Sequence, residues 1–89
     1  MRRVRVVVSG RVHGVWFRES CRRQAAVAKL SGWVRNLDDG RVEAVFQGDS
    51  AAVDTLVAWC QEGPPSAVVT RIVVEEQPPL ADEQGFSIR

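Results

Sequence analysis

The segment Trp33–Gly48, WVRNLDDGRVEAVFQG, decides how the chain folds. Two stretches rich in apolar residues, Trp33 to Leu37 and Arg41 to Gly48, flank the tripeptide Asp38-Asp39-Gly40. A glycine at that place supplies the positive φ that a tight hairpin needs. The pattern therefore predicts two adjacent antiparallel strands in the middle of the chain, and the other elements are placed around them.

A strand and a helix are expected before this hairpin. Residues 3–9 are rich in β-branched side chains, and the valines at even positions would share one face of a strand. From Phe17 to Leu30 the apolar pattern becomes helical, and Ser31-Gly32 would end that helix.

A second helix and a fourth strand are expected after the hairpin. Residues 50–61 have a helical pattern, with Asp49 or Ser50 as the N-cap and Gly63-Pro64-Pro65 as the end. Residues 68–76 are strongly β-branched but change phase, so we expect a bulge within this strand.

The predicted order is βαββαβ with a short terminal edge strand at Phe86–Arg89. Two split βαβ units with right-handed crossovers place both helices on one face of an antiparallel sheet, which is the ferredoxin-like α+β architecture with strand order 4-1-3-2. The first two strands would then be parallel, about 10 Å apart, with the third between them. Their ends, at Gly10 and at Asn36-Leu37, would lie at one edge of the sheet.

Composition indicates an ordinary globular protein. The chain has 89 residues, 45% hydrophobic and 26% charged, and we expect one domain over residues 1–89. No apolar run approaches the ~20 residues that span a bilayer, and the basic, valine-rich start is too short for a signal peptide. We therefore expect a cytoplasmic protein without membrane contact.

The formal net charge of +1 provides no bulk field toward nucleic acid or anionic lipid, so an anion site must be local. Cys21 and Cys60 have the spacing of neither a metal knuckle nor a redox pair, and both fall on apolar stripes. We expect buried thiols, and a disulfide between them stays an alternative.

The loop Gly10–Arg18, GRVHGVWFR, has the features of a phosphate cradle. Gly10 and Gly14 can adopt positive φ values, no proline removes an N–H, and a helix N-terminus follows. Arg18 in the first helical turn can close a bidentate fork on two phosphate oxygens. The simpler interpretation is a plain connection with a solvated Arg18.

Asn36 is expected at the rim of the sheet near this loop. If Val34 faces the helices, Asn36 does so too, and its amide can accept from a water while it donates to an anion. The alternative is a polar residue that only precedes the turn.

Several segments resemble the acylphosphatase family. GRVHGVWFR is similar to the signature Gly-x-Val-Gln-Gly-Val-x-Phe-Arg, and Gly32–Gly48 is similar to the second signature. The segment GPPSAVV and the terminal FSIR match the endings usual in that family, so the resemblance spans essentially the whole chain. It implies an enzyme that hydrolyses acyl phosphates to a carboxylate and inorganic phosphate.

The resemblance also implies residue roles. Arg18 would bind the substrate phosphate with the loop amides, and Asn36 would orient the attacking water. The expected amide donors are those of Arg11, Val12, His13, Gly14, Val15, Trp16 and Phe17. His13 departs from the usual Gln; it could be read as a general base, whereas a solvated loop histidine is the simpler interpretation.

The chemistry fits this set of side chains. The sequence offers no metal-ligand cluster, no paired carboxylates and no nucleophile beside a base, so such a site cannot help a poor leaving group. An acyl phosphate expels a stable carboxylate, and positioning with charge stabilisation suffices for direct attack by water. We expect no cofactor, no metal, a monomer, and a loop that phosphate or sulfate can occupy.

Two other functions stay open at this stage. A ferredoxin-like sheet also occurs in RNA-binding modules, but Trp33 is the only aromatic residue expected on the open face, which makes a poor stacking platform. A catalytically silent anion-binding module on the same fold is the other alternative. The sequence does not choose among acyl phosphates.

Overall fold

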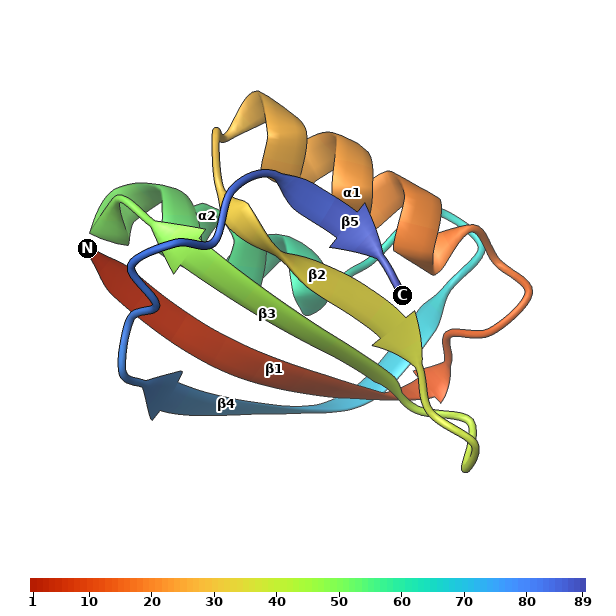
Figure 1. Cartoon of the computed structure of the whole chain (residues 1–89). Helices are drawn as coiled ribbons and strands as arrows, with labels where there is room; N and C mark the ends of the chain where they lie inside the picture. Colours follow the sequence, from red (N-terminus) through yellow and green to blue (C-terminus); the bar gives the residue numbers. More distant parts are fainter.

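The computed structural model describes residues 1–89 and contains two helices and five strands. Their order is β1 (Arg2–Arg11), α1 (Phe17–Val27), β2 (Ser31–Asn36), β3 (Val42–Gly48), α2 (Ser50–Cys60), β4 (Val68–Gln77) and β5 (Phe86–Ile88). This confirms the predicted βαββαβ order with a short terminal strand (Figure 1).

The strands form one sheet in the order β4-β1-β3-β2-β5. Because β1 and β2 both pair antiparallel with β3, they are parallel to each other, and both end on the same side of the molecule (Figure 1). The first four strands confirm the predicted order and the ferredoxin-like α+β fold. The direction of the terminal strand was not predicted: β5 pairs parallel with β2 and makes the sheet mixed.

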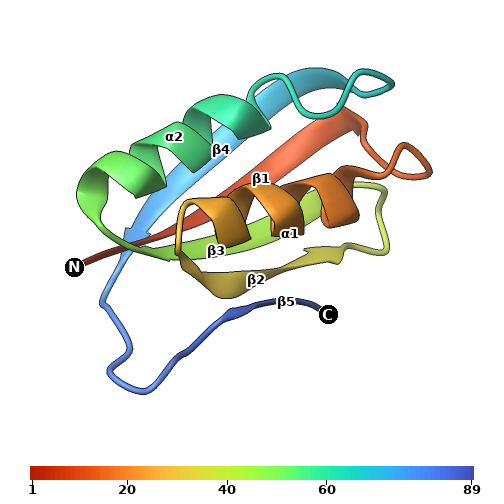
Figure 2. The ribbon, with the colours of Figure 1, turned by 90° about the horizontal axis from the view of Figure 1, so that it is seen from above.

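Both helices cover one face of the sheet, as Figure 2 shows. The valines at even positions of β1 point into the layer between sheet and helices and are fully buried. The helices meet them with apolar stripes, and these are Phe17, Cys21 and Ala25 on α1 and Val53, Leu56 and Cys60 on α2. Neither helix is long and apolar enough to cross a membrane.

Helix α1 ends at Val27 rather than at the expected Leu30. Lys29 adopts a left-handed φ of 59°, and the Leu30 N–H donates to the Ala25 carbonyl at 3.0 Å, which is a Schellman motif. The apolar Leu30 side chain is buried beyond this turn. Gly32 therefore lies within β2 rather than at the end of the helix. A Cβ atom added to Gly32 would lie 1.8 Å from the Val45 carbonyl oxygen.

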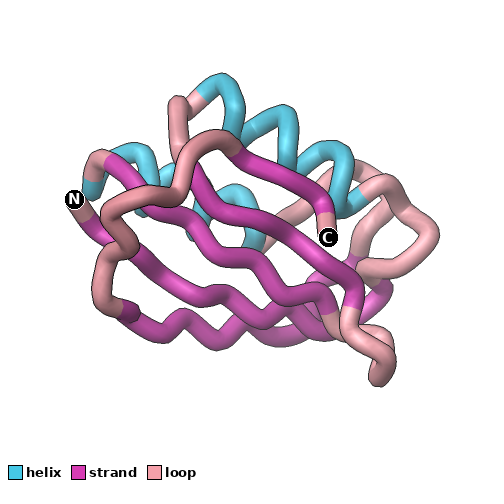
Figure 3. The backbone as a smooth tube through the Cα atoms, viewed as in Figure 1, coloured by secondary structure: helices cyan, strands magenta, loops and turns pink.

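The predicted bulge lies in β4 at the end of β1. The pairing passes from Ser9 with Arg71 to Gly10 with Val69, so Thr70 has no partner. Gly10 has a φ of 122°, and a Cβ there would lie 2.2 Å from the Val68 carbonyl oxygen. The bulge thus turns the chain out of the sheet where the loop to α1 begins. This loop, the β2–β3 hairpin and the C-terminus lie at one end of the molecule (Figure 3).

Candidate active site

The loop between β1 and α1 has two residues in the left-handed region on either side of Val15. Gly14 has a φ of 69°, as its expected role requires, and Gly10 also has the expected positive φ. Trp16, the N-cap of α1, has φ 66° and ψ 23°, which the sequence did not predict. Alternation of left-handed residues with ordinary ones curves the backbone so that successive N–H groups face one hollow.

The N–H groups of this loop are available to a ligand. No carbonyl or side chain of the protein accepts the N–H of any residue from 12 to 16. The N–H groups of the first turn of α1 have no intrahelical acceptor, and Trp16 provides no side-chain cap. A helix N-terminus with unpaired N–H groups is a ready site for an anion.

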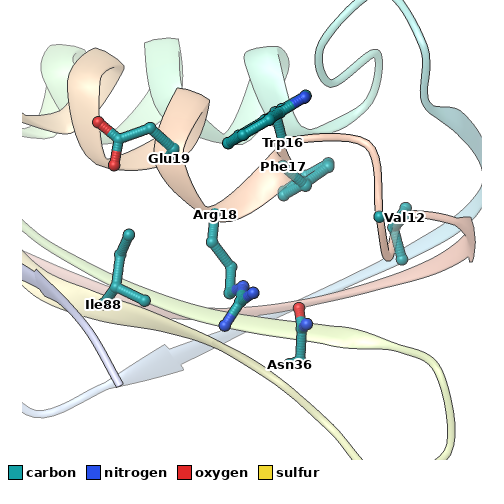
Figure 4. A pocket seen from close by; sticks show the side chains of 8 residues that line it. Val12, Trp16, Phe17, Arg18, Glu19, Asn36 and Ile88 are labelled. Atoms are coloured by element: carbon teal, nitrogen blue, oxygen red, sulfur yellow. The ribbon is translucent and has the colours of Figure 1, made fainter.

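A cavity of about 570 Å³ lies at this place. Its lining residues come from the loop, the start of α1, β2 and β5, and they are Val12, Gly14, Trp16, Phe17, Arg18, Glu19, Asn36 and Ile88 (Figure 4).

Arg18 and Asn36, the two side chains predicted to do the chemistry, point toward each other across this cavity (Figure 4). Arg18 is exposed and takes part in none of the ion pairs of the protein. Asn36 Oδ1 is buried and has no hydrogen-bond partner. A buried acceptor without a donor is unusual, and a water molecule or a ligand in the cavity would satisfy it.

The remaining loop residues named from the sequence lie in different surroundings. Val12, Gly14, Trp16 and Phe17 line the cavity, whereas Arg11, His13 and Val15 do not. Arg11 ends β1 and pairs with Val68, and Val15 is buried. The His13 ring donates from Nε2 to the Arg41 carbonyl at 2.9 Å, which ties the loop to the β2–β3 hairpin.

Glu19 and Ile88 line the cavity and were not predicted as site residues. Glu19 faces away from Arg18: hydrogen bonds from Arg22, and then from Arg23, lower its pKa to about 2. The i+3 and i+4 spacing of these arginines was the sequence signal that could have shown that Glu19 is paired with them. Ile88 reaches the cavity because β5 pairs with β2, and the sequence gives no local signal for this pairing.

No three His, Cys, Asp or Glu side chains lie close enough together to hold a metal ion. Cys21 and Cys60 are free, buried thiols.

Comparison with known proteins identifies the family to which this chain belongs. The sequence model described as Acylphosphatase matches residues 4–88. The chain belongs to the acylphosphatase family. It is 59% identical over 88 residues to an acylphosphatase of Rubrobacter xylanophilus, across 99% of this chain and 80% of that relative. It is 51% identical to an acylphosphatase of Methylococcus capsulatus, across 99% of this chain and 96% of that one.

A solved structure of the acylphosphatase family agrees with this assignment. The crystal structure of acylphosphatase from Bacillus subtilis superimposes with a TM-score of 0.95 at 42% identity, over 100% of this chain and 99% of that chain. The chain is accordingly an acyl phosphate phosphohydrolase, and its substrate is a small-molecule acyl phosphate.

Proposed function

We propose that this chain hydrolyses the carboxyl–phosphate bond by direct attack of water on phosphorus. Arg18 and the N–H groups of the loop bind the phosphoryl oxygens, and Asn36 orients the water. The observation that carries this proposal is the buried, unpartnered Oδ1 of Asn36, which faces the unpaired guanidinium of Arg18 in one cavity.

Binding of the phosphoryl group depends on Arg18. A guanidinium can donate two parallel hydrogen bonds to a phosphate, and the N–H groups of residues 12–16 add neutral donors around the same anion. The charge that develops on the equatorial oxygens is then stabilised by groups that are already in position.

Asn36 contributes a different step. Its Oδ1 accepts a hydrogen bond from a water, and its Nδ2 can donate to a phosphoryl oxygen, so one side chain fixes both reactants. The O–P bond to the carboxylate breaks as the water oxygen bonds to phosphorus, and the water's proton leaves to solvent or to the phosphate product. The leaving carboxylate is a stable anion and needs no proton from the enzyme.

The site needs neither a metal nor a covalent intermediate under this proposal. The one carboxylate that lines the cavity, Glu19, is held by Arg22 and Arg23, and no cluster of side chains offers metal ligands. We also propose a cytoplasmic monomer, to which the two reduced, buried thiols are suited. Phosphate and sulfate would compete for the same loop.

The alternatives have less support. Trp33 is the one aromatic residue of β2. The guanidinium groups of Arg35 and Arg89 lie over its ring, with their central carbons 5.3 and 4.6 Å from the ring centroid. It is therefore not an open platform for a nucleotide base. A silent binding module would leave the orphaned Asn36 oxygen without a role.

The test is hydrolysis of benzoyl phosphate in ¹⁸O-labelled water, followed by ultraviolet absorbance, with EDTA present. The proposal expects turnover that EDTA does not reduce, and label in the inorganic phosphate. Label in the benzoate would mean attack on the carbonyl carbon, and loss of activity with EDTA would mean a required metal. Either result would overturn the mechanism.

A further inference from the structure

The cavity is much larger than the reacting group. At about 570 Å³ it lies in the size range of small-molecule sites, whereas a phosphoryl group with its attacking water fills only a small part of it. Arg18, Asn36 and the loop N–H groups mark the phosphoryl end. The rest of the space is open to the acyl part of the substrate.

Two exposed apolar side chains border this remaining space. Trp16 is 79% exposed and Ile88 is 38% exposed, and both line the cavity. In Figure 4, Trp16 is drawn at the start of α1, and Ile88 and Asn36 are drawn on either side of the Arg18 guanidinium. Apolar side chains that stay exposed around a cavity are typical of a binding surface.

Both side chains are held in place by the backbone. Trp16 keeps a left-handed φ of 66°, which is costly for a bulky residue and is found mainly at functional sites. Ile88 pairs with Val34 of β2, and the Arg89 N–H donates to the Val34 carbonyl at 2.9 Å. The guanidinium of Arg89 then lies over the Trp33 ring.

We infer that Trp16 and Ile88 form an acyl subsite that selects aromatic or bulky apolar acyl phosphates over acetyl phosphate. This inference rests on the proposed function, because Arg18 must hold the phosphoryl group for the acyl group to reach these side chains. An aromatic acyl group would cover the exposed indole and stack on it, whereas an acetyl group is too small to do either.

The test compares kcat/KM for benzoyl phosphate with kcat/KM for acetyl phosphate. The ratio of the two cancels any effect of a substitution on the phosphoryl chemistry that both substrates share. The variants are Trp16→Ala, Trp16→Phe and Ile88→Ala, with Val27→Ala as the control. Val27 is an apolar residue of α1 that is about as exposed as Trp16 and does not line the cavity.

We expect Trp16→Ala to lower this ratio about 10-fold and Ile88→Ala about 3-fold, as loss of apolar contact area predicts. Trp16→Phe keeps an aromatic ring and should stay within about 3-fold of the wild type. Val27→Ala should leave the ratio unchanged. The inhibition constant of inorganic phosphate, measured for each variant, reports whether the loop still binds its anion.

Ratios in Trp16→Ala and Ile88→Ala within about 2-fold of the wild type would overturn the acyl subsite. Ile88→Ala lies on another element, so it keeps the test valid if Trp16→Ala does not fold. If Arg18→Ala is inactive on both substrates in that case, the proposed function stands without the subsite. Failure of the wild type to hydrolyse either substrate would overturn the proposed function, and the subsite with it.

Discussion

Arg18 occupies a position that is unfavourable for a cation without an anionic ligand. It lies in the first turn of α1, where the helix dipole is positive, and such a placement costs about 0.3–1 kcal/mol. The neighbouring carboxylate of Glu19 is held by Arg22 and Arg23. A bound phosphoryl dianion would offset this cost. The negative charge on its oxygens is also the charge that must be stabilised during catalysis.

Substitutions of Arg18 and Asn36 should have separable effects. Arg18→Ala and Arg18→Lys should both lose turnover by about 10³-fold or more and weaken inhibition by phosphate, because a lysine has no bidentate fork. Asn36→Ala should keep most of the phosphate inhibition, because Arg18 and the loop N–H groups still bind the anion, and lose about 10²- to 10³-fold in kcat. Steady-state kinetics of benzoyl phosphate hydrolysis with phosphate as inhibitor measure both. Near-normal kcat in Asn36→Ala would remove the role in water positioning.

His13 is predicted to act through its bond to the hairpin rather than as a base. His13→Gln should retain near-normal activity, since a glutamine amide can also donate to the Arg41 carbonyl. His13→Ala should lose about 1 kcal/mol of stability and bind phosphate a few-fold more weakly. Denaturant unfolding and phosphate inhibition would show this. A 100-fold loss in His13→Gln would mean that the imidazole takes part in the reaction.

At the scale of elements, α1 carries the site at its start and the core along its length. Phe17 lines the cavity and also packs on Trp59 of α2, with ring centroids 5.1 Å apart. One turn further along α1, Cys21 lies in the same core as Cys60 of α2. The packing of the two helices therefore holds the start of α1, and with it Arg18, against the sheet.

The two thiols are predicted to be unreactive in the folded protein. A hydrogen bond with Cys60, together with burial, raises the pKa of the Cys21 thiol well above its ordinary value. Little Cys21 thiolate forms near neutral pH, and neither the Cys21 nor the Cys60 side chain is accessible to solvent. Ellman's reagent should label neither cysteine under native conditions and both in denaturant. Labelling of only one or none in denaturant would indicate a covalent modification or a disulfide.

At the scale of the whole molecule, the strand order brings the site together. The first loop and the end of β2 are far apart in sequence, and they meet because β1 and β2 run parallel on either side of β3. This could be predicted, since alternating valines, a glycine turn at Gly40 and two helical stripes specify a small set of topologies. The glycines of the loop then predict where an anion would bind, and that site stays a prediction.

The features that the sequence did not reveal depend on tertiary contacts. Lys29 and Trp16 adopt left-handed conformations that their own side chains disfavour, so no local signal marks them. Burial of Leu30 beyond the helix end accompanies the first of these conformations. The parallel pairing of β5 follows from the path of the preceding loop, which Arg3 and Gln47 hold through Glu83 and the backbone of Leu80. Ile88 entered the site only through that pairing.

Acid should destabilise the fold in part through Glu43, which joins three strands on the face away from the helices. Burial raises the pKa of Glu43, but hydrogen bonds from Arg5 and Arg35 outweigh it and hold the pKa below its ordinary value of 4.5. A lowered pKa in the folded state stabilises the protein above about pH 4.5. That stabilisation is lost as the pH falls through the lowered value.

Glu43→Gln tests this directly. At pH 7 we expect a loss of about 1–2 kcal/mol, since Arg5 and Arg35 remain partly solvated, and a flatter decline of stability below about pH 4.5. Urea unfolding from pH 3 to 8 measures both. Glu75→Gln, an exposed carboxylate of β4 without an ion pair, should change stability by less than about 0.5 kcal/mol. Parallel pH profiles for Glu43→Gln and the wild type would contradict the assignment.

A crystal structure after a soak in inorganic phosphate tests the central claim most directly. The account predicts one phosphate in the cavity, with two oxygens on the Arg18 guanidinium and others within hydrogen-bond distance of the loop N–H groups. A water should lie between that phosphate and Asn36 Oδ1. A cavity without phosphate, with Arg18 turned toward bulk solvent, would contradict it.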